Sequence, residues 1–105
     1  MPFLDTREIP INEKLPGWRG RIFASASMTF AHWDFDAGAT IHPHSHEQEE
    51  VWQVLEGQLE VTIDGETRIA GPGMAAIAPP GAVHSVVALT PGRAMVADWP
   101  VREGF

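Results

Sequence analysis

The sequence contains no cysteine and no tyrosine, and it has only seven lysines and arginines among its 105 residues. Without cysteine the chain can form no disulfide bond, no thiolate zinc site and no cysteine nucleophile. Fourteen aspartates and glutamates give a formal net charge of −7, and no cluster of basic residues stands out. Such a chain would repel a phosphate backbone, so we do not expect nucleic acid as a partner.

Long hydrophobic runs are missing as well. No window approaches the roughly 20 apolar residues that a membrane-spanning helix requires. The first five residues, Met1 to Asp5, lack the basic region and apolar stretch of a secretory signal. We therefore expect a soluble, cytoplasmic protein without membrane association.

What the chain does contain is a regular alternation of turn residues and short apolar segments. Ten glycines and nine prolines punctuate the sequence, and no stretch of ten residues has the 3.6-residue period of a helix. The expected strands lie within residues 24–35, 51–55, 58–63, 66–70, 74–78, 83–89 and 93–99. Many short strands with turns between them favour an all-β antiparallel sandwich or barrel.

The length suits one domain that covers residues 1–105, because a chain of this size can bury a single core but not two. We expect the barrel core at 24–99 and an N-terminal arm or edge segment at 1–20. Asp64-Gly65 predicts a type I′ hairpin turn, since both central positions of that turn need positive φ.

The five histidines are the main candidates for a functional site in this sequence. His44 and His46 are two residues apart in an extended segment, so their side chains point to the same face. Glu50 has the same parity, and a bend after His46 would return its carboxylate to that face. His84 follows a stiff Pro-Pro-Gly turn much later in the chain. Three imidazoles and a carboxylate, with positions left for water or substrate, suit one divalent transition metal (Fe, Mn, Ni, Zn, Co or Cu) rather than Ca or Mg.

The alternative is that these histidines are structural. A single histidine on a strand is more often exposed or part of a satisfied core, and residues 42–46 would also suit a solvated loop. That interpretation does not explain the common parity of His44, His46 and Glu50. It also leaves Glu50 buried without a cation, which costs several kcal/mol. The favoured prediction is therefore a metal held by His44, His46, Glu50 and His84.

The spacing of these residues resembles the two motifs of the cupin family. Gly38-x5-His44-x-His46-x3-Glu50-x6-Gly57 is similar to the first motif, and Gly73-x5-Pro79-x-Gly81-x2-His84 is similar to the second. Ala88 stands where the second motif usually ends in asparagine. The resemblance covers about residues 24–99. It implies a double-stranded β-helix, or jelly-roll, barrel in which the two histidines, the glutamate and the later histidine bind one metal.

Several other residues are candidates for the same site. His42 shares the parity of His44, so we predict it as a catalytic residue that carries a proton, with an exposed or supporting position as the alternative. Gln48 is a candidate contact to the metal or to one of its ligands. Trp52 has the parity of Glu50 and would line the pocket or pack in the core. His32 is expected to be structural. The arginines that are candidate partners of a substrate carboxylate are Arg21, Arg68, Arg93 and Arg102.

A second resemblance concerns the C-terminal segment Pro100-x-Arg102-x-x-Phe105 and the stretch from His44 to Glu50. Both are similar to the small cupins that handle unsaturated uronates from pectin and alginate breakdown. Those proteins catalyse a ring-opening tautomerisation to a linear keto-sugar acid. They carry glutamine in the place of Glu50, and aspartate and phenylalanine in the places of Val96 and Asp98, so this chain departs from their pattern.

Three functions are compatible with the sequence. The first is a metalloenzyme that acts on a small oxygenated, sugar-acid-like substrate, by Lewis-acid-assisted isomerisation or by O₂-dependent chemistry. The others are a module that binds a small ligand without turning it over, and a metal-stabilised structural domain. Because an open sandwich of this size has edges to protect, we also expect a homodimer.

Overall fold

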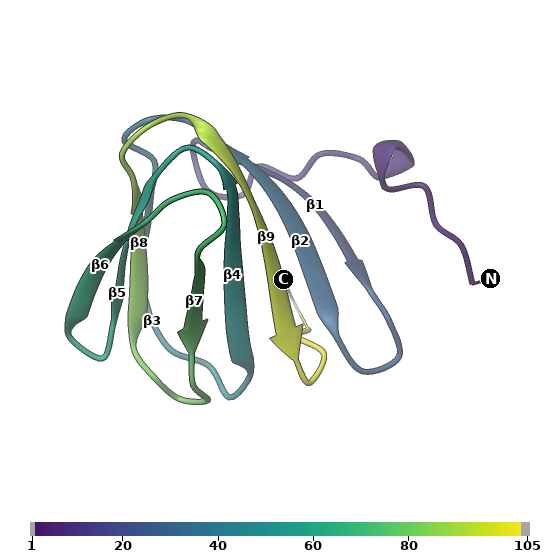
Figure 1. The fold of residues 1–105 in the computed structure, drawn as a ribbon. Helices are drawn as coiled ribbons and strands as arrows, with labels where there is room; N and C mark the ends of the chain where they lie inside the picture. Colours follow the sequence, from purple (N-terminus) through teal and green to yellow (C-terminus); the bar gives the residue numbers. More distant parts are fainter. Residues whose placement is uncertain (1, 104–105) are drawn as a thin grey trace.

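The computed structural model describes residues 2–103 and consists of a short 3-10 helix followed by nine β-strands (Figure 1). In chain order they are η1 (Thr6–Glu8), β1 (Trp18–Ala24), β2 (Thr29–Phe35), β3 (Thr40–His44), β4 (Glu49–Glu56), β5 (Leu59–Ile63), β6 (Glu66–Ala70), β7 (Ala75–Ala78), β8 (His84–Ala88) and β9 (Gly92–Trp99). Among the described residues, no helix has the length and apolar character needed to cross a bilayer.

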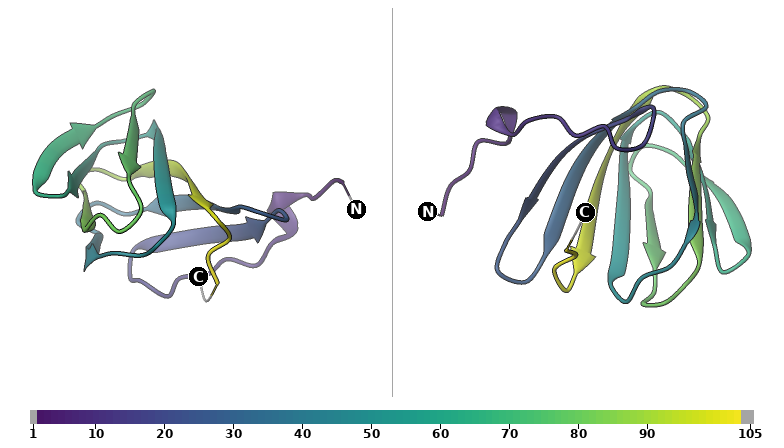
Figure 2. Two further views of the ribbon diagram at one scale, coloured as in Figure 1. Left: turned by 90° about the horizontal axis from the view of Figure 1, so that it is seen from below. Right: turned by 180° about the vertical axis from the view of Figure 1, so that it is seen from behind.

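The strands form two antiparallel sheets that face each other. One has five strands in the order β1-β2-β9-β4-β7, and the other has four in the order β3-β8-β5-β6. Figure 2 shows the two sheets closing around a common interior, with the N-terminal segment extending away from the barrel. This is a jelly-roll architecture, so the all-β barrel predicted from the turn spacing and the motifs is confirmed.

Most expected strands are present with small shifts at their ends. The exception is the segment 24–35, which is not one strand, because a turn at residues 25–28 divides it between β1 and β2. β1 begins at Trp18 and forms an edge of the five-stranded sheet. The expected hairpin turn is confirmed, since Asp64 has φ 48° and Gly65 has φ 82°.

The core lies between the sheets and is dominated by aromatic side chains. Trp18 is fully buried and packs edge-to-face on Trp33 and Trp52, with ring centroids 6.2 and 5.8 Å away. Along β2, β4 and β9 buried side chains alternate with more exposed ones, as one buried face requires. Aromatic packing therefore fixes the strands whose ends carry the polar residues described below.

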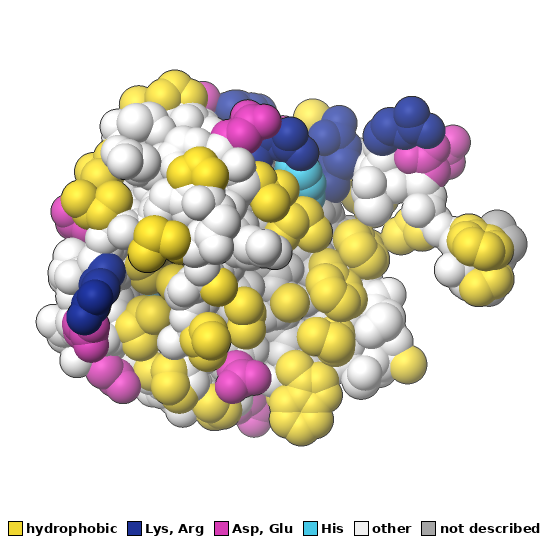
Figure 3. Space-filling model, in the orientation of Figure 1, with side chains coloured by type: hydrophobic (Ala, Val, Ile, Leu, Met, Phe, Trp, Pro, Cys, Tyr) yellow, Lys and Arg dark blue, Asp and Glu magenta, His cyan; other side chains and the backbone are white. Residues whose placement is uncertain are grey.

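Part of the outer face of the five-stranded sheet is apolar as well. A cross-strand row runs through all five strands, because Phe23 pairs with Phe30, Phe30 with Ala97, Ala97 with Val51 and Val51 with Ile77. Figure 3, which views this face, shows hydrophobic side chains spread across it.

Candidate metal centre

The interior becomes polar at one end of the barrel. Thr29, Asp98 and Glu50 stand opposite one another on β2, β9 and β4, in a row that faces inward. All three are buried, and the side chain of Asp98 is 0% exposed. Two carboxyl groups thus lie side by side in the interior, where an unpaired charge is costly.

The facing sheet contributes histidines to the same place. His44 at the end of β3 pairs with His84 at the start of β8, and their ring centroids are 4.2 Å apart. His46 follows β3, and its ring centroid lies 4.9 Å from that of His84. The structure therefore brings together the three histidines that the sequence predicts as ligands, from segments about 40 residues apart.

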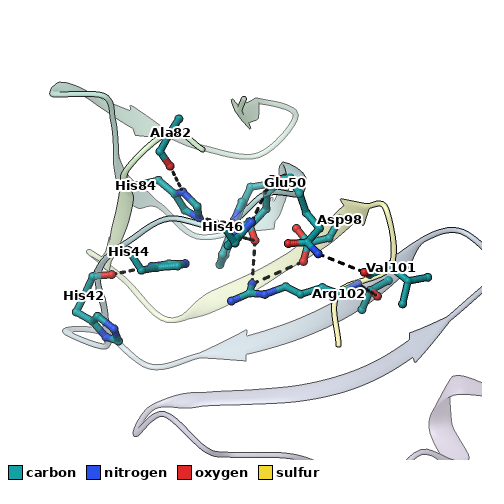
Figure 4. Close-up of polar contacts among 12 residues, drawn as sticks. His42, His44, His46, Glu50, Ala82, His84, Asp98, Val101 and Arg102 are labelled. Carbon is teal, nitrogen blue, oxygen red and sulfur yellow. Dashed lines mark hydrogen bonds and ion pairs between the residues drawn. The ribbon is translucent and has the colours of Figure 1, made fainter. Parts of the chain in front are cut away.

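His42 is not part of this group. Ile41 pairs with Val86 and His44 with His84, so β3 contains one extra residue, a β-bulge, between these two pairs. The bulge breaks the alternation on which the prediction of an inward His42 rests. The His42 side chain is exposed, and Figure 4 shows its ring turned away from the other three.

Each of the three imidazoles is oriented by a backbone carbonyl two residues away. Nδ1 of His44 lies 2.8 Å from the carbonyl of His42, Nδ1 of His84 lies 2.9 Å from that of Ala82, and Nδ1 of His46 lies 3.1 Å from that of Gln48 (Figure 4). A carbonyl oxygen only accepts, so Nδ1 is the donor in each ring. This leaves the Nε2 lone pairs available, as is usual for histidines that bind metals.

The Nε2 atoms converge on Glu50. Oε1 of Glu50 is 3.3 Å from Nε2 of His46, and Oε2 is 3.1 Å from Nε2 of His84. One nitrogen from each of His44, His46 and His84 lies within 4.8 Å of the others. The four residues that the sequence predicts as metal ligands are therefore neighbours in space.

The electrostatics of the site keep Glu50 ionised. Burial alone would raise its pKa, but contacts with His84 and Asp98 and the hydrogen bond from Trp52 outweigh burial and lower the pKa of Glu50 to about 2. The Glu50 carboxylate raises the pKa of His84. Burial lowers the pKa values of His44 and His46, which favours neutral rings.

Asp98 also belongs to the site, although the sequence analysis did not place it there, and Arg102, one of the four candidate arginines, lies beside it. Burial, followed by the charge of Glu50, raises the pKa of Asp98 to about 8. Nη1 of Arg102 lies 3.4 Å from Oε1 of Glu50 and 3.7 Å from Oδ2 of Asp98. The sequence did contain a signal for Asp98, because it follows Ala94 and Val96 at the same two-residue spacing and so shares their buried face of β9. Carboxyl groups are seldom buried on an apolar face without a partner, so such a position indicates a site.

The segment that carries Arg102 is tied to the barrel by two buried side chains. Thr29 Oγ1 accepts a 2.9 Å hydrogen bond from the backbone nitrogen of Arg102, and the side-chain amide of Gln48 donates to the carbonyl of Val101 at 3.3 Å. Gln48 thus holds the C-terminal segment in place through its side-chain amide, and its backbone carbonyl orients the ring of His46. Phe105 lies outside the described residues.

A cavity of about 250 Å³ opens beside the histidines and Glu50. Trp52 lines it, as predicted, and so does Trp33, which also packs against Trp18 in the core. Of the candidate arginines, Arg102 lines this cavity, and Lys14 from the N-terminal segment lines it too. The further lining residues are Asn12, Leu15, Ile22, Ile41, His44, Glu50 and Val96. His32 faces the other side of the sheet, where Nε of Arg93 donates to its Nε2 at 3.1 Å.

The donors present fit a divalent transition metal. Nε2 of His46 and Nε2 of His84 are buried, and neither makes an aligned hydrogen bond with a described residue. A cation shared with the Glu50 carboxylate would satisfy both, and nitrogen donors favour Fe, Mn, Ni, Zn, Co or Cu over Ca or Mg. Glu50 and Asp98 also lie, with His46, within 4.8 Å of one another, so a cation would offset two neighbouring carboxyl groups.

This arrangement agrees with comparisons against known proteins. The sequence profile of the family described as the cupin domain matches residues 31–100, which include all four predicted ligands. The chain is a cupin. The resemblance inferred from its two histidine motifs is therefore confirmed.

Solved structures with this fold include an RmlC-like cupin from Shewanella frigidimarina, which is 25% identical with a TM-score of 0.91 over 98% of this chain and 94% of that one. KdgF from Halomonas sp. is 31% identical with a TM-score of 0.89, over 98% and 96% of the two chains. Oxalate decarboxylase OxdC from Bacillus subtilis has a TM-score of 0.80 at 20% identity, over 92% of this chain and 29% of that one, and this likeness concerns the fold alone. No curated protein matches the chain.

Proposed function

We propose that this cupin is a metal-dependent enzyme that isomerises a small oxygenated acid of the sugar-acid type. The observation that carries the proposal is the cavity of about 250 Å³, in which Lys14 and Arg102 share the walls with the predicted ligands His44 and Glu50. A carboxylate needs cationic partners and a sugar needs hydrogen-bonding groups, and both kinds of group line this one cavity.

A divalent transition metal, when bound by His44, His46, Glu50 and His84, supplies Lewis-acid polarisation of an oxygen on the substrate. The remaining work falls to the protein. The three Nδ1–H groups hold the rings so that Nε2 faces the centre, and Arg102 presents its guanidinium group to the acidic end of the substrate. Asp98 holds a proton beside Glu50 near neutral pH, because its pKa is raised to about 8.

The apolar wall of the cavity contributes by limiting water. Trp33, Trp52, Ile22 and Val96 line the cavity together with the charged groups, and they offer few places for solvent to hydrogen-bond. Polar contacts between the substrate and Arg102 or Lys14 gain strength when water is excluded around them.

The likeness to KdgF supports the choice of substrate class. KdgF aligns with 98% of this chain, and the small cupins of uronate breakdown are the proteins that the segments 44–50 and 100–105 resemble. Those relatives carry an aspartate in the place of Val96, whereas this chain has Asp98 at the next inward position of β9. The carboxyl group is thus displaced along the same strand face, toward Glu50.

His42 stays a proposed proton carrier. Its ring centroid lies 5.7 Å from that of His44, and its exposed side chain lies outside the residues that line the cavity. The variant His42→Gln tests this role.

The proposal is tested by screening unsaturated uronates with the metal-loaded protein and following the loss of their ultraviolet absorbance. We expect turnover by the wild type and an increase in KM of about tenfold or more in Arg102→Gln, because a charge-assisted contact to the carboxylate is lost. Arg68→Gln is the matched control, since Arg68 is exposed, pairs with Glu66 on the edge strand β6 and does not line this cavity. Saturable uronate binding without turnover would instead identify a binding module, and O₂ uptake with catechols or thiols would identify an oxygenase.

We also propose that the chain acts as a homodimer in the cytoplasm. The apolar row Phe23–Phe30–Ala97–Val51–Ile77 supports pairing through the outer face of the five-stranded sheet, at whose end Ile77 and Trp99 are each 56% exposed. Light scattering should give twice the mass of the chain for the wild type and the mass of one chain for Ile77→Glu. A wild type of single-chain mass would contradict the proposed dimer.

A further inference from the structure

A second cavity lies on the opposite side of the five-stranded sheet from the metal centre. It has a volume of about 310 Å³ and is lined by Thr6, Arg7, Arg21, His32, Asp34 and Arg93. Three of the seven basic residues of an acidic chain therefore meet at one place. Figure 3 shows this concentration, where Lys and Arg side chains gather around a histidine beside the N-terminal helix.

The strands hold these side chains at fixed positions. Arg21 on β1 stands directly opposite His32 on β2, and Asp34 on β2 stands opposite Arg93 on β9. Their neighbours Ile22 and Trp33 point inward and line the metal-centre cavity. The cavity on the outer face is thus built on rigid sheet, with η1 supplying Thr6 and Arg7.

The charged groups differ in how they are satisfied. Arg7 pairs with Asp5 at 2.9 Å, and Arg93 lies 3.3 Å from Glu56 and 3.7 Å from Asp34. Nε of Arg21, in contrast, is buried and has no hydrogen-bond partner among the described residues. A buried guanidinium donor without an acceptor is unfavourable, so this position calls for an oxygen from outside the chain.

We propose that this cavity binds a small oxyanion, a phosphate or carboxylate group, through the guanidinium group of Arg21. A guanidinium group presents parallel N–H donors that match two oxygens of either anion. His32 accepts from Arg93 through Nε2, so its proton is on Nδ1, and Thr6 adds a hydroxyl group to the lining. The site is separate from the metal centre and does not depend on the proposed function.

The test is a titration of the full-length protein with inorganic phosphate and, in a second series, with tricarballylate, at constant ionic strength. Binding is followed by calorimetry and by the NMR signal of the Arg21 Nε–H group. We expect saturable binding of at least one anion. The anion that binds more tightly shows whether the site takes a phosphate group or a carboxylate group. Arg21→Gln should weaken this binding by about tenfold or more, whereas Arg68→Gln should leave it unchanged.

Two further variants keep the outcome decisive. Arg21→Lys retains the charge but loses Nε–H, so it should also bind more weakly, and it replaces Arg21→Gln if that variant does not fold. His44→Ala disables the metal centre and should bind the anion as the wild type does, which separates this site from the proposed catalytic one. Non-saturable binding of both anions, or wild-type affinity in the Arg21 variants, would overturn the proposal.

Discussion

The indole Nε1–H of Trp52 donates a 2.6 Å hydrogen bond to Oε2 of Glu50, two residues earlier on β4. The same tryptophan packs against Trp18 in the core. A core side chain thus orients a proposed metal ligand, which links the packing of the barrel to the geometry of its metal centre.

This link predicts the effect of removing the indole donor. Trp52→Phe keeps most of the aromatic packing but leaves Glu50 less well oriented, so metal affinity should fall by about tenfold or more while the fold is retained. Competition with a chelator measures the affinity, and circular dichroism checks the fold. Trp99→Phe, at an exposed position, is the control, and equal affinities in the two variants would argue against the role of Trp52.

The buried carboxyl pair predicts an unusual dependence of stability on pH. The pKa of Asp98 is raised to about 8 in the folded protein, so between its ordinary value and 8 the folded state binds more protons than the unfolded state. Stability therefore falls as the pH rises through this window. Glu50, with a pKa lowered to about 2, has the opposite effect, but only below pH 4.5.

Asp98→Asn removes this dependence. Between pH 5 and pH 8, with a chelator present, the free energy of unfolding of the variant should rise relative to the wild type by up to about 1.4 kcal/mol per pH unit. Urea denaturation at each pH gives the comparison. Parallel pH profiles for the two proteins would show that Asp98 is ionised in the folded state.

How much of this site was predictable depends on the range of the interaction. Motif spacing was enough to predict that four residues are neighbours, namely His44, His46, Glu50 and His84. Local turn chemistry was enough to predict the Asp64-Gly65 hairpin. The bulge that turns His42 outward was not predictable, because it depends on the register of β3 against β8. The division of segment 24–35 into two strands was missed because its turn, at residues 25–28, contains neither glycine nor proline.

The acidic partner of Glu50 was missed for a different reason. In the sequence, Asp98 stood out only as a difference from the uronate cupins. Its parity with Ala94 and Val96, which puts it on the buried face of β9, was overlooked. The position of Arg102 depends on contacts with Thr29 and Gln48, which are 73 and 53 residues from their partners in the sequence. Such long-range contacts leave no local pattern.

One of the motif glycines should be sensitive to substitution. Gly57 has φ 80°, and a Cβ there would collide with the carbonyl oxygen of Pro91. Gly57→Ala should lower the free energy of unfolding by about 2–4 kcal/mol, from backbone strain and overpacking together. Gly71→Ala is the control, because a Cβ at Gly71 meets no atom within 4 Å. Equal denaturation midpoints for the two variants would contradict this prediction.

The proposed role of His42 can be separated from metal binding. Its backbone carbonyl accepts from His44, so the variant His42→Gln keeps that contact and should keep the metal. If the imidazole carries a proton during turnover, kcat should fall by about 10²-fold or more, with the metal content unchanged. An unchanged kcat would rule out this role for His42.

The most direct test of the account is the metal content of the purified protein after incubation with Fe, Mn, Ni, Zn, Co or Cu and removal of excess ion. Elemental analysis should find one tightly held transition metal per chain in the wild type, and its loss in both His44→Ala and His84→Ala. His32→Ala, on the outer face of β2, should retain it. A wild type that holds none of these ions, or ligand variants that keep a full complement, would contradict the assignment of the site.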